Sequence, residues 1–365
     1  RWSRQVGLAF AAALALAAPS AGTARESFGP VAVSSPIQQA LAASAIAEVG
    51  DVLVSKGDAI LVHTSHIAGI RATPHLWRWA SVTKQVIATL VMQEVATGHV
   101  GLDQPVSRYL PGFRSANAGL VTVRQLLRHQ SGLPNPDDTA ATPESVPAYD
   151  APGYTGSRDP LTGYCAGPVK RAPGGNWEYN NCDYIVAGAL LEAVTGKPWQ
   201  RLVQQRIAKP LGLTSLGAFP TGKSTVPGTI NGRPEAGIDL NAFGASAGLY
   251  GTLADLWKFD RALMTGKLLP DSARAEMWDG KPELGSIALG QWAFSAPLKG
   301  CAAPVRIIER RGAIGGVEVR NFILPDADIV AIIFVDRADF AFGEVWQGQG
   351  FSHDLLAAAA CSGVK

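Results

Sequence analysis

Apolar side chains recur at helical spacing between Ser81 and Thr97, and Gly98 ends the run. Because apolar residues occupy most sides of this segment, we expect a central helix that is buried all round. Helical spacing predicts further helices elsewhere along the chain, over residues 36–49, 122–129, 184–195, 199–207, 253–264 and 353–360. Residues 135–176 have no clear period and are rich in Pro, Gly, Asp and Thr, which is typical of a functional loop.

Strand patterns lie near both ends of the chain. Residues 51–55 and 59–63 flank Lys56-Gly57-Asp58, which predicts a β-hairpin with glycine in its turn. Near the other end, apolar runs predict strands over residues 305–309, 317–324 and 329–335. The simplest assembly pairs the first and last segments in one antiparallel sheet flanked by the terminal helices. The sequence therefore predicts an α/β fold of the α+β type.

This assembly also predicts a division into domains. At about 150 residues per domain, a chain of 365 residues holds two or three structural units. We expect residues 36–110 and 286–365 to form the α/β domain. Residues 111–285 would form a mainly helical domain beside it.

Composition narrows the function classes. Apolar residues make up 47% of the chain and charged residues 17%, which excludes a disordered polyelectrolyte. The 32 basic residues nearly balance the 30 acidic ones, and no basic run occurs. A nucleic-acid partner is therefore not expected, because such proteins carry a clustered basic stripe.

The first residues resemble an export signal. Arg1 and Arg4 precede an apolar run over residues 6–18, and small residues follow it. This order is typical of a secretory signal peptide, which we place at residues 1–24. The run is too short for a stable membrane span, and a buried Ala-rich helix is the alternative. We expect a periplasmic or secreted protein.

The four cysteines, Cys165, Cys182, Cys301 and Cys361, suit an oxidising compartment. Three pairings are possible, and the favoured one joins Cys165 to Cys182, which leaves Cys301 with Cys361. Four buried thiols are the alternative. The spacing excludes a Cys-x-x-Cys metal site, and His63 with His66 lacks a third ligand at suitable spacing. We expect neither a metal nor an organic cofactor.

Candidate chemistry begins at Ser81, three residues before Lys84. On a helix this spacing places the hydroxyl and the amine on one face, one turn apart. A helix N-terminus and apolar neighbours both disfavour a charged ammonium, so Lys84 can activate Ser81 as a nucleophile. The alternative is that Ser81 caps the helix and Lys84 is solvated.

Two further segments carry polar groups suited to catalysis. Tyr179-Asn180-Asn181 precedes a predicted helix, and tyrosine can relay protons while asparagine both donates and accepts. At residues 310–313, Arg310-Arg311-Gly312-Ala313, a glycine at a strand lets a substrate backbone approach, and an arginine can hold a carboxylate. From spacing alone, a buried tyrosine and solvated arginines are the simpler interpretations.

Together these segments resemble the serine β-lactamase and penicillin-binding protein superfamily, in its class C β-lactamase-like branch. That branch includes D-Ala-D-Ala carboxypeptidases, D-amino-acid peptidases and family VIII esterases. The similar segments follow the family's order from about Pro74 to Val335: residues 79–85 around the nucleophile, 101–113, 122–133 with the LLxHxSGL pattern, 177–184 with Tyr-x-Asn, and 247–256. The resemblance implies a β-lactamase/transpeptidase-like fold.

The resemblance also implies roles for the matched residues. Ser81 would accept the acyl group, Lys84 and Tyr179 would transfer protons, and Asn181 would contact the substrate amide. The main-chain amides of Ser81 and Ala313 would form the oxyanion hole. The family usually has Lys or His, then Thr or Ser, then Gly in its third motif. This chain departs from that pattern with the substrate-binding candidates Arg310, Arg311 and Gly312.

We therefore expect an exported serine hydrolase that acts through an acyl-enzyme on Ser81, on peptide, amide or ester substrates. The D-amino-acid peptidase and esterase types are favoured over a class C-like β-lactamase, because the third motif departs. A catalytically silent penicillin-recognising binding protein is the alternative from another class.

A second serine motif is rejected. Gly244-Ala245-Ser246-Ala247-Gly248 fits the nucleophile elbow of α/β-hydrolases, but a polar segment precedes it where that motif needs an apolar strand.

Overall fold

The computed structural model describes residues 35–67, 69–70 and 74–362. From Ser35 onward the chain forms one compact unit. The predicted signal peptide, residues 1–24, lies outside the described residues. Within them, none of the helices combines the length and the hydropathy that crossing a bilayer requires.

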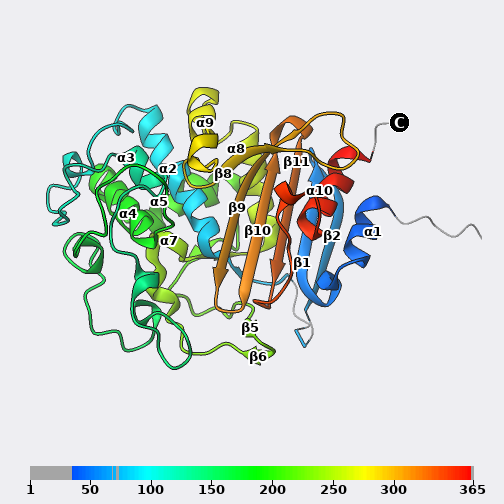
Figure 1. Ribbon diagram of the computed structural model, residues 1–365, viewed down its shortest axis with the longest axis horizontal. Coiled ribbons are helices and arrows are strands. Elements are labelled where there is room, and N and C mark those ends of the chain that lie inside the picture. The colour runs from blue at the N-terminus through cyan, green and yellow to red at the C-terminus, as the bar shows by residue number, and fades with distance from the viewer. Residues whose placement is uncertain (1–34, 68, 71–73, 363–365) are drawn as a thin grey trace, which may run out of the picture. The chain divides into compact units, whose positions relative to one another are not determined.

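A six-stranded antiparallel sheet joins the two ends of the chain, in the order β2-β1-β11-β10-β9-β8. Its strands are β1 (Val49–Lys56), β2 (Ala59–Ile67), β8 (Trp292–Ala296), β9 (Val305–Ile314), β10 (Val317–Leu324) and β11 (Ile329–Val335). The early strand β1 pairs directly with the late strand β11, side by side in Figure 1. Every residue of β11 is buried, as its unbroken apolar run predicts.

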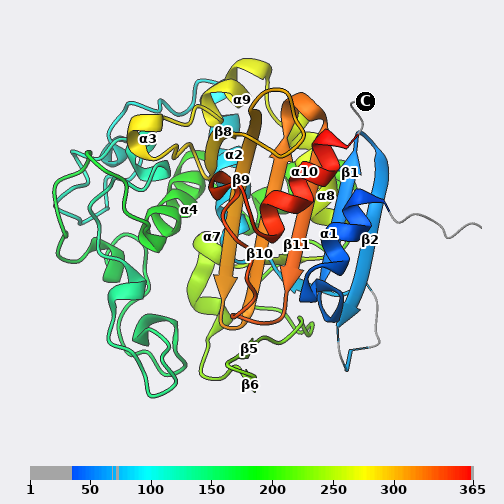
Figure 2. The same cartoon turned by 45° about the vertical axis from the view of Figure 1, so that its right-hand side comes forward.

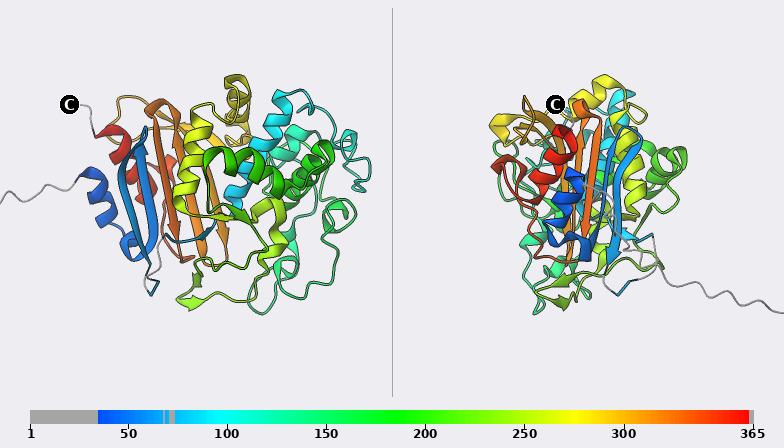
Figure 3. Two further views of the ribbon diagram at one scale, coloured as in Figure 1. Left: turned by 180° about the vertical axis from the view of Figure 1, so that it is seen from behind. Right: turned by 90° about the vertical axis from the view of Figure 1, so that its right-hand side faces the viewer.

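Helices cover both faces of this sheet. On one face lie α1 (Pro36–Ala42) and α10 (Phe351–Cys361), which pack against each other in front of the strands in Figure 2. Helix α8 (Leu253–Met264) packs on β1 and β11 from behind, as Figure 3 shows. Helix α2 (Thr83–Ala96) lies deeper on the same side and is almost wholly buried. The predicted fold class is confirmed.

The remaining helices surround α2 and connect the two parts of the sheet. They are α3 (Val123–Leu127), α4 (Asn181–Thr195), α5 (Trp199–Val203), α6 (Lys209–Leu211), α7 (Gly244–Ala247) and α9 (Asp271–Met277). A small second sheet has the order β3-β7-β4, with β3 (Trp77–Arg78), β4 (Gly217–Ala218) and β7 (Leu249–Gly251). A two-stranded ribbon joins β5 (Thr229–Ile230) to β6 (Arg233–Pro234). The predicted domain boundaries at residues 110 and 285 stay a prediction.

Several predicted boundaries move for local reasons. The helix expected over residues 36–49 is wrong beyond Ala42, because the Ser44 side chain accepts the Ile46 N–H and starts a separate 3₁₀ turn that leads into β1. Helix α4 begins before residue 184, since the Asn180 side chain caps it by accepting the Cys182 N–H. Strand β8 was not predicted.

Two disulfides tie the fold together. Cys165 pairs with Cys182, and Cys301 pairs with Cys361, which is the pairing that the sequence favours. The first holds the long loop to the start of α4. The second holds the segment between β8 and β9 to the end of α10.

We expect loss of the second bridge to destabilise the fold more than loss of the first. The loops span 17 and 60 residues, and chain entropy assigns them about 3 and about 4 kcal/mol respectively. Replacing each cysteine pair by serine and measuring urea unfolding checks this order. Four free thiols in unfolded, unreduced protein would show instead that no bridge forms.

Candidate active site

Ser81 lies in a 3₁₀ turn, Ala80–Val82, immediately before α2 begins at Thr83. The preceding residue, Ala80, has a φ of +46°, a left-handed conformation that costs energy for a residue with a Cβ. Strand β9 packs against this turn at Gly312, where an added Cβ would lie 2.7 Å from the Ser81 backbone nitrogen. Glycine is therefore required at residue 312 for the strand to approach the nucleophile.

The Lys84 amine is fully buried and lies within hydrogen-bond distance of four oxygens. Its Nζ is 3.0 Å from Ser81 Oγ and 2.7 Å from Tyr179 OH. It is also 2.7 Å from Asn181 Oδ1 and 2.9 Å from the Ser246 carbonyl oxygen. Burial, reinforced by the positive charge of Arg310, holds the pKa of Lys84 well below its usual value near 10.5.

A neutral amine fits these four neighbours. The Asn181 and Ser246 oxygens only accept, so each takes one of the two N–H groups of a neutral amine. The remaining lone pair then faces the two hydroxyls, of Ser81 and Tyr179, either of which can donate to it. The geometry thus directs the Lys84 lone pair at the Ser81 hydroxyl, as the predicted role of Lys84 as a base requires.

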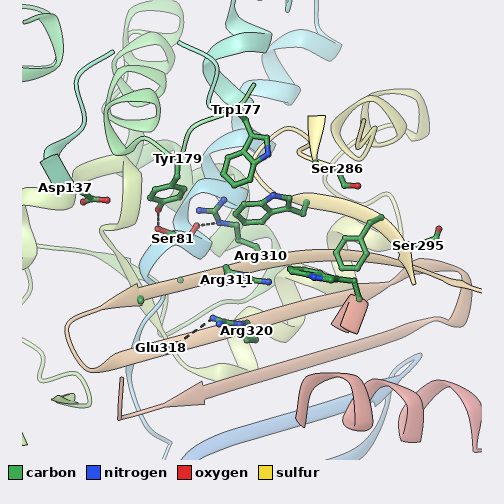
Figure 4. A pocket seen from close by; sticks show the side chains of 16 residues that line it. Ser81, Asp137, Trp177, Tyr179, Ser286, Ser295, Arg310, Arg311, Glu318 and Arg320 are labelled. Atoms are coloured by element: carbon green, nitrogen blue, oxygen red, sulfur yellow. Dashed lines mark hydrogen bonds and ion pairs between the residues drawn. The ribbon is translucent and has the colours of Figure 1, made fainter. Parts of the chain in front are cut away.

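The structure brings Tyr179 and Asn181 to the same point, as predicted from their motif. The Tyr179 hydroxyl is hydrogen-bonded to Ser81 Oγ, and Figure 4 shows the two side chains facing each other. Burial raises the pKa of Tyr179, while the Arg310 charge opposes that shift. Asn181 is oriented by Asp137, because its Nδ2 donates to Asp137 Oδ1 at 3.0 Å.

Strand alternation directs Arg310 and Arg311 to opposite faces of the sheet, as expected. Arg310 is buried beneath the rings of Tyr179 and Trp292, with its guanidinium carbon 5.7 Å and 5.3 Å from their centroids. Its Nε donates to the Ser81 carbonyl oxygen at 2.8 Å. Neither Nη1 nor Nη2 has a hydrogen-bond partner among the described residues.

The donors of Arg311 are occupied by two carboxylates. Its Nη1 and Nη2 donate to Glu344 at 2.9 Å and 2.8 Å, and its Nε donates to Glu309 at 2.9 Å. Of the two arginines, Arg310 is therefore the one without a carboxylate partner among the described residues. Its Nη groups are buried, so contact with a substrate carboxylate would need the covering rings to move. Binding of a substrate carboxylate by Arg310 stays a prediction.

The predicted oxyanion hole lies where β9 has an open edge. Strand β8 pairs with β9 only from Val305 to Glu309, so within the described part of the chain the residues from Arg310 onward have no paired strand on that side. Ala313 is exposed there and lines the same cavity as Ser81. The contribution of its N–H, together with that of Ser81, stays a prediction.

The cavity around Ser81 has a volume of about 960 Å³. Beyond the predicted residues, it is lined by side chains that sequence reasoning missed, chiefly Asp137, Trp177, Trp292, Phe294, Glu318, Arg320 and Trp346. Asp137 lies in the long loop that was predicted to be functional. The composition of that loop indicated the region, but no motif indicated Asp137 itself. The aromatic residues follow no period that could have revealed them.

Two other segments that the sequence analysis considered, around His129 and around Ser246, contact the site residues but do not form a separate site. His129 is buried against the Tyr179 ring, and its Nδ1 accepts the Asn180 N–H at 3.3 Å. Burial holds the pKa of His129 well below its usual range. In the rejected elbow motif, the Ser246 hydroxyl donates to the Phe243 carbonyl, while the Ser246 carbonyl accepts from Lys84. That carbonyl contact could not be predicted from the sequence.

Known proteins share this architecture. Esterase EstB of Burkholderia gladioli is 36% identical over 154 residues, 39% of this chain and 38% of that protein. The D-alanyl-D-alanine-carboxypeptidase/endopeptidase AmpH of Escherichia coli is 25% identical over 283 residues, 72% of this chain and 71% of that protein. The chain spans about half or less of the length of the first curated relatives it matches.

Among solved structures, a D-stereospecific amidohydrolase from Streptomyces sp. superposes with a TM-score of 0.69 and 25% identity. The match covers 90% of this chain and 99% of that one. The statistical model of the family described as Beta-lactamase matches residues 39–346. With that match over most of its length, the chain belongs to the β-lactamase family.

Proposed function

We propose that the protein hydrolyses amides or small peptides of amino acids through an acyl-enzyme on Ser81. The observation that carries the proposal is the hydrogen-bonded group of Ser81, Lys84 and Tyr179 at the base of a cavity. A hydroxyl flanked by a neutral buried amine and a second hydroxyl has the groups that nucleophilic catalysis requires.

The proposed acylation moves one proton from Ser81 to the leaving group by way of Lys84 and Tyr179. Lys84 accepts the Ser81 proton, either directly or through the Tyr179 hydroxyl, while Oγ bonds to the substrate carbonyl carbon. The resulting oxyanion accepts hydrogen bonds from the main-chain N–H groups of Ser81 and Ala313. When the carbon–nitrogen bond breaks, Tyr179 donates a proton to the leaving amine and recovers one from Lys84. Water then hydrolyses the ester and restores Ser81.

Asp137 supports the choice of substrate. Its exposed carboxylate lines the cavity next to Asn181, where it can accept a hydrogen bond from a substrate ammonium. The D-stereospecific amidohydrolase noted above supports amides of D-amino acids. Arg310 has no carboxylate partner among the described residues, so it would suit a substrate that also carries a carboxylate if the rings that cover its buried Nη groups move aside. The esterase match favours esters as the second candidate substrate class.

We also propose that the protein is exported and acts in the periplasm or outside the cell. The pattern of residues 1–24 is typical of a signal peptide. Both disulfides support the same location, because an oxidising compartment maintains them.

Fluorophosphonate labelling tests the nucleophile and its proton path. We expect the wild-type protein to be labelled and Ser81→Ala to remain unlabelled. Lys84→Ala and Tyr179→Phe should each slow acylation about 100-fold or more with folding retained, as expected for loss of a general base. Wild-type protein that resists the probe would favour the silent binding protein, and unchanged acylation by Tyr179→Phe would remove the tyrosine from the path.

The charge of Arg310 should set the acid limb of the pH profile. Because that charge helps to keep Lys84 neutral, Arg310→Gln should raise the pKa of Lys84. Protonated Lys84 cannot accept the Ser81 proton, so activity would be lost at a higher pH than in the wild type. The profile of kcat/KM on a neutral ester measures this shift. Arg310→Lys, which keeps the charge, is the control, and an unmoved limb in Arg310→Gln contradicts the account.

Asp137→Asn should weaken the binding of substrates with a free amine. Asparagine keeps an oxygen that can accept from Asn181 Nδ2, so the motif itself should remain intact. We expect KM for a D-amino-acid amide to rise about tenfold, the loss of one charge-assisted hydrogen bond. The N-acetylated amide should be unaffected. Equal losses on both compounds would show that Asp137 acts through Asn181 and not on the amine.

A further inference from the structure

The cavity that contains Ser81 extends beyond the nucleophile. Because β8 stops pairing with β9 at Glu309, the cavity continues round the open edge of β9 to the opposite face of the sheet. We define this extension as the outer arm, and its lining residues are Trp292, Phe294, Arg311, Glu318, Arg320 and Trp346. None of them takes part in the proposed acylation.

Aromatic rings form the walls of the outer arm. Trp292 meets Trp177 edge to face with their centroids 5.6 Å apart, at the end nearer Ser81. Phe294 meets Trp346 in the same way at 6.0 Å, at the far end. Trp346 is 55% exposed. A large apolar side chain left in water at a cavity wall indicates a surface that a ligand covers.

The charged side chains of the outer arm face opposite charges. Arg311 is bound by Glu309 and Glu344, and its guanidinium carbon lies 5.8 Å from the Trp292 ring centroid and 5.6 Å from that of Trp346. Arg311 therefore positions the two indole rings. Because Glu309 and Glu344 already occupy its donors, it is not the group that would bind an anionic ligand.

Arg320 is similarly occupied at the far side of the arm. Its Nη1 is 3.8 Å from Glu318, and its guanidinium carbon is 4.4 Å above the Phe342 ring. Each cation of the arm thus has a carboxylate beside it. The aromatic walls, and not a charge, are the part of the arm left for a ligand.

We propose that the outer arm is a subsite for a flat, uncharged aromatic group that the substrate carries away from its scissile bond. Such a ring can stack on Trp346 and meet the Phe294 edge. This inference rests on the proposed function and adds a substrate class to it, namely amides or esters with an aryl substituent.

Two fluorophosphonates with the same reactive centre test the subsite. One carries a short alkyl arm and the other an arm that ends in a naphthyl ring. We expect the naphthyl probe to label Ser81 about tenfold faster in the wild type, since ring stacking and burial add to its binding. Trp346→Ala should remove this advantage without changing the short-arm rate. Trp346→Phe should retain most of it.

The control is Leu120→Ala, which removes an exposed apolar side chain that does not line the cavity. It should label like the wild type. Equal rates for the two probes in the wild type, or an advantage that survives Trp346→Ala, would overturn the subsite. Trp346 is more than half exposed, so its variants should fold, which thermal unfolding verifies.

A failure of the proposed function gives a different result. If neither probe labels Ser81, that function is wrong, and calorimetric titration with N-(2-naphthyl)acetamide decides the subsite separately. Binding that Trp346→Ala weakens and Trp346→Phe keeps would support the subsite. No binding, or equal binding by wild type and Trp346→Ala, would overturn it.

Discussion

The burial of the Lys84 amine is the constraint on which the rest of the site depends. An amine removed from water must either lose its charge or find compensating partners. Here two oxygens that can only accept, from Asn181 and Ser246, take its N–H groups and leave its lone pair for Ser81 and Tyr179. Arg310 adds a second positive charge that further disfavours protonation. These contacts therefore position the amine, while burial and the Arg310 charge lower its pKa.

The fold provides these partners from segments that lie far apart in the sequence. Helix α2 contributes Lys84, the start of α4 contributes Asn181, and α7 contributes the Ser246 carbonyl. Strand β9 approaches the nucleophile because residue 312 has no side chain. Pairing of β1 with β11 completes the sheet that carries β9. Loss of packing between sheet and helices would therefore act on the chemistry through the placement of Lys84.

Local patterns predicted most of the helices and strands. Helix α8 and strands β10 and β11 have the predicted bounds, because periodic apolar runs between clear turns determine them. The family motifs indicated Ser81, Lys84 and Tyr179, which the structure brings into hydrogen-bond contact, and their catalytic roles stay a prediction. The Ser246 carbonyl and the Trp292 and Trp346 walls could not be predicted, since main-chain contacts and loop aromatics depend on tertiary packing and leave no period in the sequence.

The most direct test of this account is the protonation state of Lys84 in the resting protein. Selective ¹³C labelling of lysine, with Lys84 assigned by the Lys84→Arg variant, would follow its Cε resonance through a pH titration. The account predicts that Lys84 titrates well below the usual value for a lysine. A Lys84 resonance that titrates with the solvent-exposed lysines, near the usual value of about 10.4, would contradict it.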